Sequence, residues 1–138
     1  MDWFTFEGIN WLAVLVAFVV SFAVGWWWYS PAGFWRLWRD KAGITDEMME
    51  GGNMGVAFGG TILATGLGVI VLAMLMNGLG IDDWSGGLVL GLVVGLILRG
   101  GAHAIHNGFA QRSPAVTLID AAHDAVGLGV AGLIIGLF

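Results

Sequence analysis

The stretch RGGAHAIHNGFAQRSPAVTLIDAAHD, residues 99–124, decides the fold because it places ionisable side chains inside two otherwise apolar runs. A short polar break, QRSP at positions 111–114, separates the two runs. The first run begins near Gly86, and the second continues to Phe138. Because so short a connector makes two helices antiparallel neighbours, we expect the charged ends of the two runs to lie against each other.

The composition is that of a membrane protein. The 138 residues are 58% hydrophobic and 11% charged, and the mean hydropathy is +0.86. A soluble domain is about 45–50% apolar and about 25% charged, and a membrane-spanning helix needs about 20 apolar residues. We therefore expect an all-α integral membrane protein, a four-helix transmembrane bundle that forms a single domain over residues 1–138. The expected spans are 9–29, 54–76, 86–108 and 115–138.

The same composition excludes several kinds of chemistry. The chain has no cysteine, which excludes disulfides, thiolate catalysis and cysteine metal sites. Its net charge is −5, and it has no block of Lys or Arg suited to nucleic acid. Residues 1–7 lack the basic segment of a signal peptide, so we expect the first apolar run to be retained as a span. We expect a lipid bilayer around the protein and no cofactor.

Tryptophan is concentrated at the end of the first span. The letters WWWY occupy positions 26–29, and FWRLWR follows at 34–39 after Pro31. Indole rings settle at the headgroup level of a bilayer, so this position favours anchoring there, with a short interfacial helix after the first span. The alternative use of these rings is a ligand cage. The expected anchors are Trp26, Trp27, Trp28, Tyr29, Trp35 and Trp38.

Small residues recur in the last three spans, mostly at four-residue spacing. Such rows leave smooth helix faces that let another helix approach closely. We expect tight packing within the bundle, with faces left over for a second copy of the chain or a partner membrane protein. The rows are Gly60, Ala64 and Gly68; Gly87, Gly91 and Gly95; and Gly127, Ala131, Gly132 and Gly136.

The cations of the loops fall on one side of the four expected spans. They lie in the loop between the first two spans and in the loop between the last two, which share a side. The positive-inside rule then places these loops in the cytoplasm and both termini outside. We expect a multi-pass protein of the plasma membrane. The loop cations are Arg36, Arg39, Lys41 and Arg112.

Six ionisable residues are expected to form one buried polar cluster between the third and fourth spans. Arg99 lies roughly 15–20 Å from the turn, near the middle of the hydrocarbon. An unpaired guanidinium there costs on the order of 3 kcal/mol, so it needs a carboxylate, and Asp124 at the matching depth can be held bidentately. We expect His103 to pair with Asp120 or His123. The six are Arg99, His103, His106, Asp120, His123 and Asp124.

Three interpretations of this cluster are open. In the structural one, an ion pair locks the helical hairpin and the histidines are neutral, packed side chains. In the second, histidine and aspartate form a path for protons or ions. In the third, a divalent metal ion binds in the bundle core. The candidate metal ligands are His103, His106, Asp120, His123 and Asp124.

The functional expectation follows from the size of the bundle. Four spans of this length enclose little on their own, and the small-residue rows offer more packing faces than one bundle uses. We therefore expect a non-enzymatic membrane protein that works as a homo-oligomer or as an accessory subunit. The alternative is a proton- or ion-coupled transporter or channel, and a metal-dependent membrane enzyme comes third.

Two segments carry a resemblance to a known family. The first is Asn10-Trp11, Gly25 and Trp28-Tyr29-Ser30-Pro31 with Phe34 and Trp38; the second is Leu118-Ile119-Asp120-Ala121 with His123 and Gly132. Together they resemble the domain of unknown function 1761 family. The resemblance covers most of the chain and implies a small four-span membrane protein, with no reaction attached. It does not extend to Arg99, His103 or His106.

Overall fold

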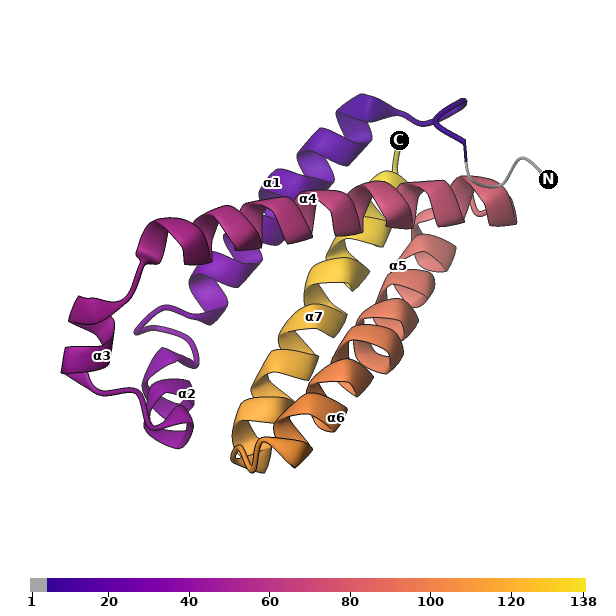
Figure 1. Cartoon of the computed structure of the whole chain (residues 1–138). Helices are drawn as coiled ribbons and strands as arrows, with labels where there is room; N and C mark the ends of the chain where they lie inside the picture. The colour runs from indigo at the N-terminus through magenta and orange to yellow at the C-terminus, as the bar shows by residue number, and fades with distance from the viewer. Residues whose placement is uncertain (1–4) are drawn as a thin grey trace.

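The computed structural model describes residues 5–138, and every regular element in that range is a helix (Figure 1). Residues 1–4 of the expected domain lie outside this range. The elements are α1 (Trp11–Trp28), α2 (Trp35–Ala42), α3 (Asp46–Gly51), α4 (Met54–Leu79), α5 (Trp84–Val93), η1 (Val94–Gly100), α6 (Gly101–Phe109) and α7 (Pro114–Ile135). Four stretches are long and apolar enough to cross a membrane: α1, α4, the continuous α5–η1–α6 stretch and α7. The expected all-α fold with four membrane-crossing helices is confirmed.

Local capping explains where the spanning helices begin and end. The Asn10 side chain accepts hydrogen bonds from two backbone N–H groups in the first turn of α1. Asp83 caps α5, and hydrogen bonds from the Ser85 hydroxyl and the Gly86 N–H lower the pKa of its carboxyl. Gly80 ends α4 in the left-handed conformation, at φ +67°. These caps shift the observed helix ends by two or three residues from the expected ones.

The third span packs against α7 with almost no space between the two backbones. A Cβ on Gly87 or Gly91 would lie 2.1 Å from a carbonyl oxygen of α7, and one on Gly95 would lie 2.3 Å from another. These distances are far shorter than any van der Waals contact, so only glycine permits this helix spacing. This row of small residues therefore serves packing inside the bundle.

A wide π-helical turn, η1, interrupts the same span. Such turns add a residue to the helical repeat and change the direction of the side chains that follow. Gly95 and Gly100 within it are buried, and a Cβ on Gly100 would lie 2.9 Å from the Ala121 Cβ of α7. Arg99 lies at the end of this turn. The side chains of α6 therefore point in other directions than they would if the whole span were a regular α-helix.

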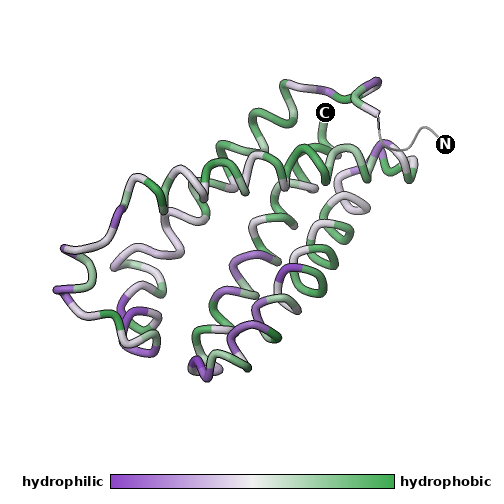
Figure 2. Tube along the Cα trace, viewed as in Figure 1, coloured by the Kyte–Doolittle hydropathy of each residue, from purple (hydrophilic) through white to green (hydrophobic). Residues whose placement is uncertain are grey.

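Only the second half of α4 joins the core, because this helix crosses the others at an angle (Figure 1). Residues 54–64, most of its first half, are all exposed, and a Cβ on Gly60 would meet no atom within 4 Å. No helix of the described chain makes the close approach to Gly60 that its small-residue row predicts. Figure 2 shows apolar residues along most of α1 and α4, and polar ones on the ends of α6 and α7 that lie near α2. The buried core consists of Val14, Ala17, Val69, Leu72, Ala73, Met76, Leu128 and Ala131.

The two basic loops lie at the same end of the molecule. The Arg112 guanidinium donates a hydrogen bond to the Ala42 carbonyl at 3.4 Å, which joins one loop to the other. At the opposite end, the Asn77 amide donates to the Glu7 carbonyl at 2.9 Å. The helices therefore alternate in direction along the chain, as a four-span topology requires.

Candidate functional site

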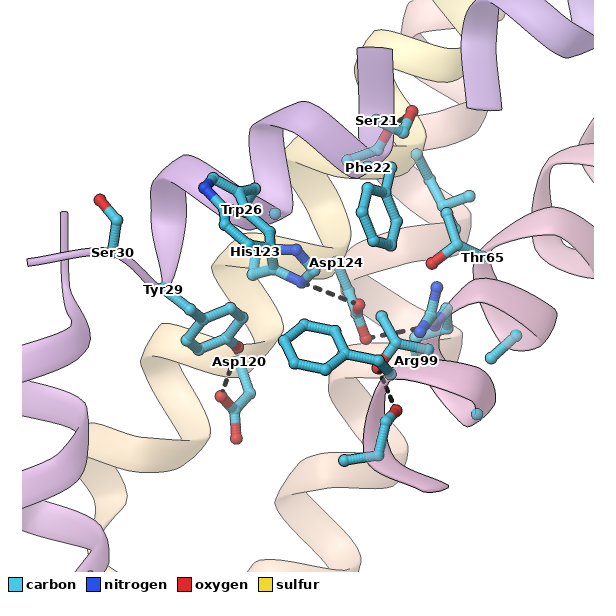
Figure 3. A pocket seen from close by; sticks show the side chains of 18 of the residues that line it. Ser21, Phe22, Trp26, Tyr29, Ser30, Thr65, Arg99, Asp120, His123 and Asp124 are labelled. Atoms are coloured by element: carbon cyan, nitrogen blue, oxygen red, sulfur yellow. Dashed lines mark hydrogen bonds and ion pairs between the residues drawn. The ribbon is translucent and has the colours of Figure 1, made fainter. Parts of the chain in front are cut away.

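A cavity of about 940 Å³ lies where α4 diverges from α1 and α7. Figure 3 shows ionisable side chains from different helices meeting in it. Ser30, Pro31 and Met54 line it near the basic loops, whereas Val69 and Leu128 of the buried core line its other end. The wall residues with charged or titratable side chains are Tyr29, Arg99, His103, Asp120, His123 and Asp124.

Asp124 is the centre of a group that we call the Asp124 cluster: Arg99, His103, His123 and Asp124. The Asp124 side chain is only 4% exposed. Its Oδ2 lies 3.2 Å from Arg99 Nε and 3.0 Å from His103 Nε2, and its Oδ1 lies 3.3 Å from His123 Nδ1. One buried carboxylate thus meets a permanent cation and two titratable rings. The contact of Arg99 is made through Nε, in place of the bidentate fork that we expected.

Asp120 lies about one helical turn from Asp124, on the side of the basic loops. Its Oδ1 accepts hydrogen bonds from the Tyr29 hydroxyl at 2.7 Å and from Trp38 Nε1 at 2.8 Å. The expected pairing of Asp120 with His103 is not made, because His103 contacts Asp124. The end of α1 and helix α2 pack against α7 here and supply the donors that Asp120 meets.

The interaction of Asp120 with Tyr29 and Trp38 was missed from the sequence. Both aromatic residues were expected to anchor the chain at the membrane interface, and the structure turns their polar atoms toward α7. A signal was present, since a tyrosine hydroxyl or an indole N–H needs an acceptor when its ring is buried. Anchoring at the membrane interface stays a prediction for all six aromatic residues, of which Trp26 and Trp27 are the exposed ones.

His106 does not belong to the cluster, which corrects our prediction. It lies exposed on α6, about 60° around the helix from His103. The row that faces α7 continues instead from His103 to Asn107, whose side-chain amide donates to the Thr117 hydroxyl at 3.2 Å. The prediction assumed a regular α-helix and placed His106 on its buried face. Near the end of the span, the face that contacts α7 is narrower and does not include His106.

His123 connects the cluster to α1. A Cβ on Gly25 would lie 2.9 Å from His123 Nε2, so the glycine makes room for the imidazole ring. The ring also packs beside Tyr29 and Trp28, with centroid separations of 5.1 and 6.0 Å. His123 therefore lies between the Asp124 carboxylate and the aromatic rings at the end of α1.

The candidate metal ligands do not come together in one site. Within residues 5–138, no three His, Asp or Glu side chains converge as a metal site needs. The candidate ligands are dispersed, because Asp120 faces α1 and α2 while His106 points outward. Two histidine rings and one guanidinium instead contact the single Asp124 carboxylate.

The comparisons with known proteins identify a family. The sequence matches the family model described as "Protein of unknown function (DUF1761)" over residues 12–136, which includes nearly all of the four spanning helices. No curated protein and no solved structure matches the chain significantly. The chemistry of the site therefore has to be derived from its own geometry.

Proposed function

This chain belongs to the DUF1761 family of proteins of unknown function, as its sequence motifs predicted, and we propose that it is a small proton-linked transporter. The substrate site is the cavity between α1, α4 and α7, and the Asp124 cluster is the site that accepts and releases protons. The protein is not an enzyme in this proposal.

The observation that carries the proposal is the depth of the cavity. Asp124 on its wall lies ten residues into α7, about 15 Å along the helix axis. Beyond this point the core closes the bundle, with Val69 and Leu72 of α4 packed near Leu128 of α7. A cavity that reaches mid-membrane from one end and stops at an apolar core favours a carrier that alternates between two sides over an open channel.

The charges of the site support the link to protons. Intramembrane ionisable residues are costly and mark proton or substrate paths in many transporters. Here the cluster combines Arg99, Asp124 and two histidines, so its net charge changes with the protonation of either ring. Occupation of the cavity by a charged molecule would favour one of these protonation states, which is how substrate and proton become coupled.

The test is proton flux into liposomes that hold the purified protein and a trapped pH-sensitive dye. After an external acid step with potassium and valinomycin present, we expect these liposomes to acidify faster than protein-free ones, because the carrier in this proposal also alternates between the two sides with a proton bound and no substrate. Asp124→Asn should lower the rate to the protein-free value while its circular dichroism and elution volume stay unchanged. Trp27→Leu, outside the cavity, should keep the wild-type rate. Equal rates with and without the protein would contradict the proposal.

We also propose that the working unit is a homo-oligomer. The first half of α4 exposes apolar side chains such as Val56 and Leu63, together with Gly59, whose Cβ position meets no atom within 4 Å. A second copy packed against this half would cover the helix that borders the cavity. Native mass spectrometry in mild detergent should show one species larger than 14.6 kDa, and a purely monomeric mass would contradict this part of the proposal.

A further inference from the structure

We propose that the part of the cavity nearest the basic loops binds an organic cation, held between the Asp120 carboxylate and the aromatic rings of α1 and α2. This names the substrate class of the transporter proposed above and rests on that proposal. The site comprises Trp26, Tyr29, Trp35 and Asp120, which all line the cavity. It is separate from the Asp124 cluster, whose charges compensate one another.

The first reason is the balance of charge. Of the described residues that form the cavity wall, Arg99 is the one Lys or Arg, and it contacts Asp124. Among residues 5–138, no cationic side chain lies within ion-pair distance of Asp120, which receives only the neutral donors of Tyr29 and Trp38. Both donors bind Oδ1, so Oδ2 is left for another partner. An anionic carboxylate in a membrane cavity favours a positively charged occupant.

The titratable groups that face Asp120 among residues 5–138 do not form an ion pair with it. From α1 it faces Tyr29, which is neutral as a donor, and from α2 it faces Trp38, which does not titrate. On α7 the neighbouring His123 makes its polar contact with Asp124. From the third span, His103 is likewise bound to Asp124. No described side chain therefore forms an ion pair with Asp120, and its Oδ2 is left for a cation that enters the cavity.

The second reason is the aromatic lining. Indole and phenol rings attract cations to their faces, and several such rings around one site select organic ammonium groups. Trp35 stacks on Trp38 with a centroid separation of 5.7 Å, so Asp120 and Trp35 contact the same indole ring from α7 and α2. Trp26 of α1 packs against Phe58 of α4 at 6.1 Å, and both line the cavity.

The third reason is size. Small-molecule sites enclose about 300–1,000 Å³, and this cavity, at about 940 Å³, is far larger than a metal ion needs. Phe22, Ala57 and Ala64 add apolar wall, and Thr61 and Thr65 add hydroxyls. The occupant is therefore an amphiphilic molecule with a cationic group and an apolar body.

The test compares two rigid probes of nearly equal shape and opposite charge, tetraphenylphosphonium and tetraphenylborate. Binding to the purified protein in detergent is measured by equilibrium dialysis, with protein-free micelles as the background. We expect the phosphonium to bind at least about tenfold more tightly than the borate, since only its charge is opposite to that of Asp120. Equal binding of the two probes, or tighter binding of the borate, would overturn the proposal.

Two variants and one matched control locate the binding. Asp120→Asn keeps an acceptor for Tyr29 and Trp38 but removes the charge, and should weaken phosphonium binding by about tenfold. Trp35→Leu leaves those hydrogen bonds in place and should weaken it by about threefold. Trp27→Leu, an exposed ring outside the cavity, should bind like the wild type. Wild-type affinity in both folded variants would show that the probe binds elsewhere.

This experiment can fail separately from the flux experiment. Proton flux that depends on Asp124, without selective phosphonium binding, would remove the cation site and leave the transporter. Selective binding that depends on Asp120 and Trp35, without any flux, would keep the cation site and remove proton-linked transport.

Discussion

Among the described residues, Asp124 is the charged side chain that is buried most deeply, because the spanning helices enclose its carboxylate almost fully. A buried carboxylate is stable only if nearby groups replace the water that it has lost. Arg99, His103 and His123 do so from two helices, and they leave neither oxygen without a partner. Removal of one partner should therefore cost more than the loss of a surface ion pair.

We expect Arg99→Met to lower the free energy of unfolding by about 1–3 kcal/mol, because the Asp124 carboxylate loses its one permanent cation. Arg99→Lys should cost less, since the charge is kept. Unfolding in mixed micelles of rising dodecyl sulfate content, followed by circular dichroism, measures the change. In the double variant with Asp124→Asn, part of the loss should be recovered, by about 0.5–3 kcal/mol. Strictly additive effects would show that the two side chains do not interact.

At the scale of elements, glycine determines how close the third span can come to α7. The row from Gly87 to Gly95 places two helix backbones in direct contact, and this contact brings Arg99 and His103 within reach of Asp124. In contrast, the glycines in the first half of α4 meet no other helix of the described chain. Similar rows of small residues thus have different structural roles in the two spans.

Gly91→Ala should destabilise the protein by about 1–3 kcal/mol, because its Cβ would lie 2.1 Å from the Leu128 carbonyl oxygen and force the helices apart. The matched control is Gly108→Ala in α6, which adds the same methyl group at an exposed position where nothing lies within 4 Å. That change should be neutral or stabilise the helix by up to about 1 kcal/mol. The same unfolding assay compares them, and equal losses would contradict the packing that we describe.

At the scale of the whole molecule, the angle of α4 creates the cavity. If this helix ran parallel to α1 and α7 along its full length, its first half would fill the cavity that Phe58 and Asp120 now line. The helix is held at its other end, where Leu72 and Met76 are buried in the core. The bundle is therefore closed at one end and divided by a cavity toward the basic loops.

The alternating helix directions allow a direct test of orientation, since the chain has no cysteine of its own. Asp82→Cys and Ala110→Cys place single thiols at exposed positions near opposite ends of the third span. From the positive-inside rule, a membrane-impermeant maleimide should label Asp82→Cys in intact cells. It should label Ala110→Cys only after permeabilisation. The reverse pattern would place the basic loops outside.

Sequence reasoning was sufficient for properties that depend on composition and on short distances along the chain. Hydropathy alone predicts the membrane class and four spans, and motifs in the first and last spans predict the family. The closeness of Arg99 to Asp124 can be predicted by counting residues from the short turn that joins the two helices. In an antiparallel helical hairpin, residues that are equally far from the turn lie opposite each other. Such features need no knowledge of how the other helices are placed.

The tertiary structure decided what lies around that hairpin. Tyr29 and Trp38 reach Asp120 across 91 and 82 residues of sequence, and the cavity depends on the angle at which α4 crosses. Helix crossing angles come from how many side chains pack together, and no periodicity within a single helix encodes them. The wide turn in η1 and the outward position of His106 likewise follow from contacts with α7. Hydrophobic patterning determines which segments enter the membrane, and packing between segments decides which polar atoms meet inside it.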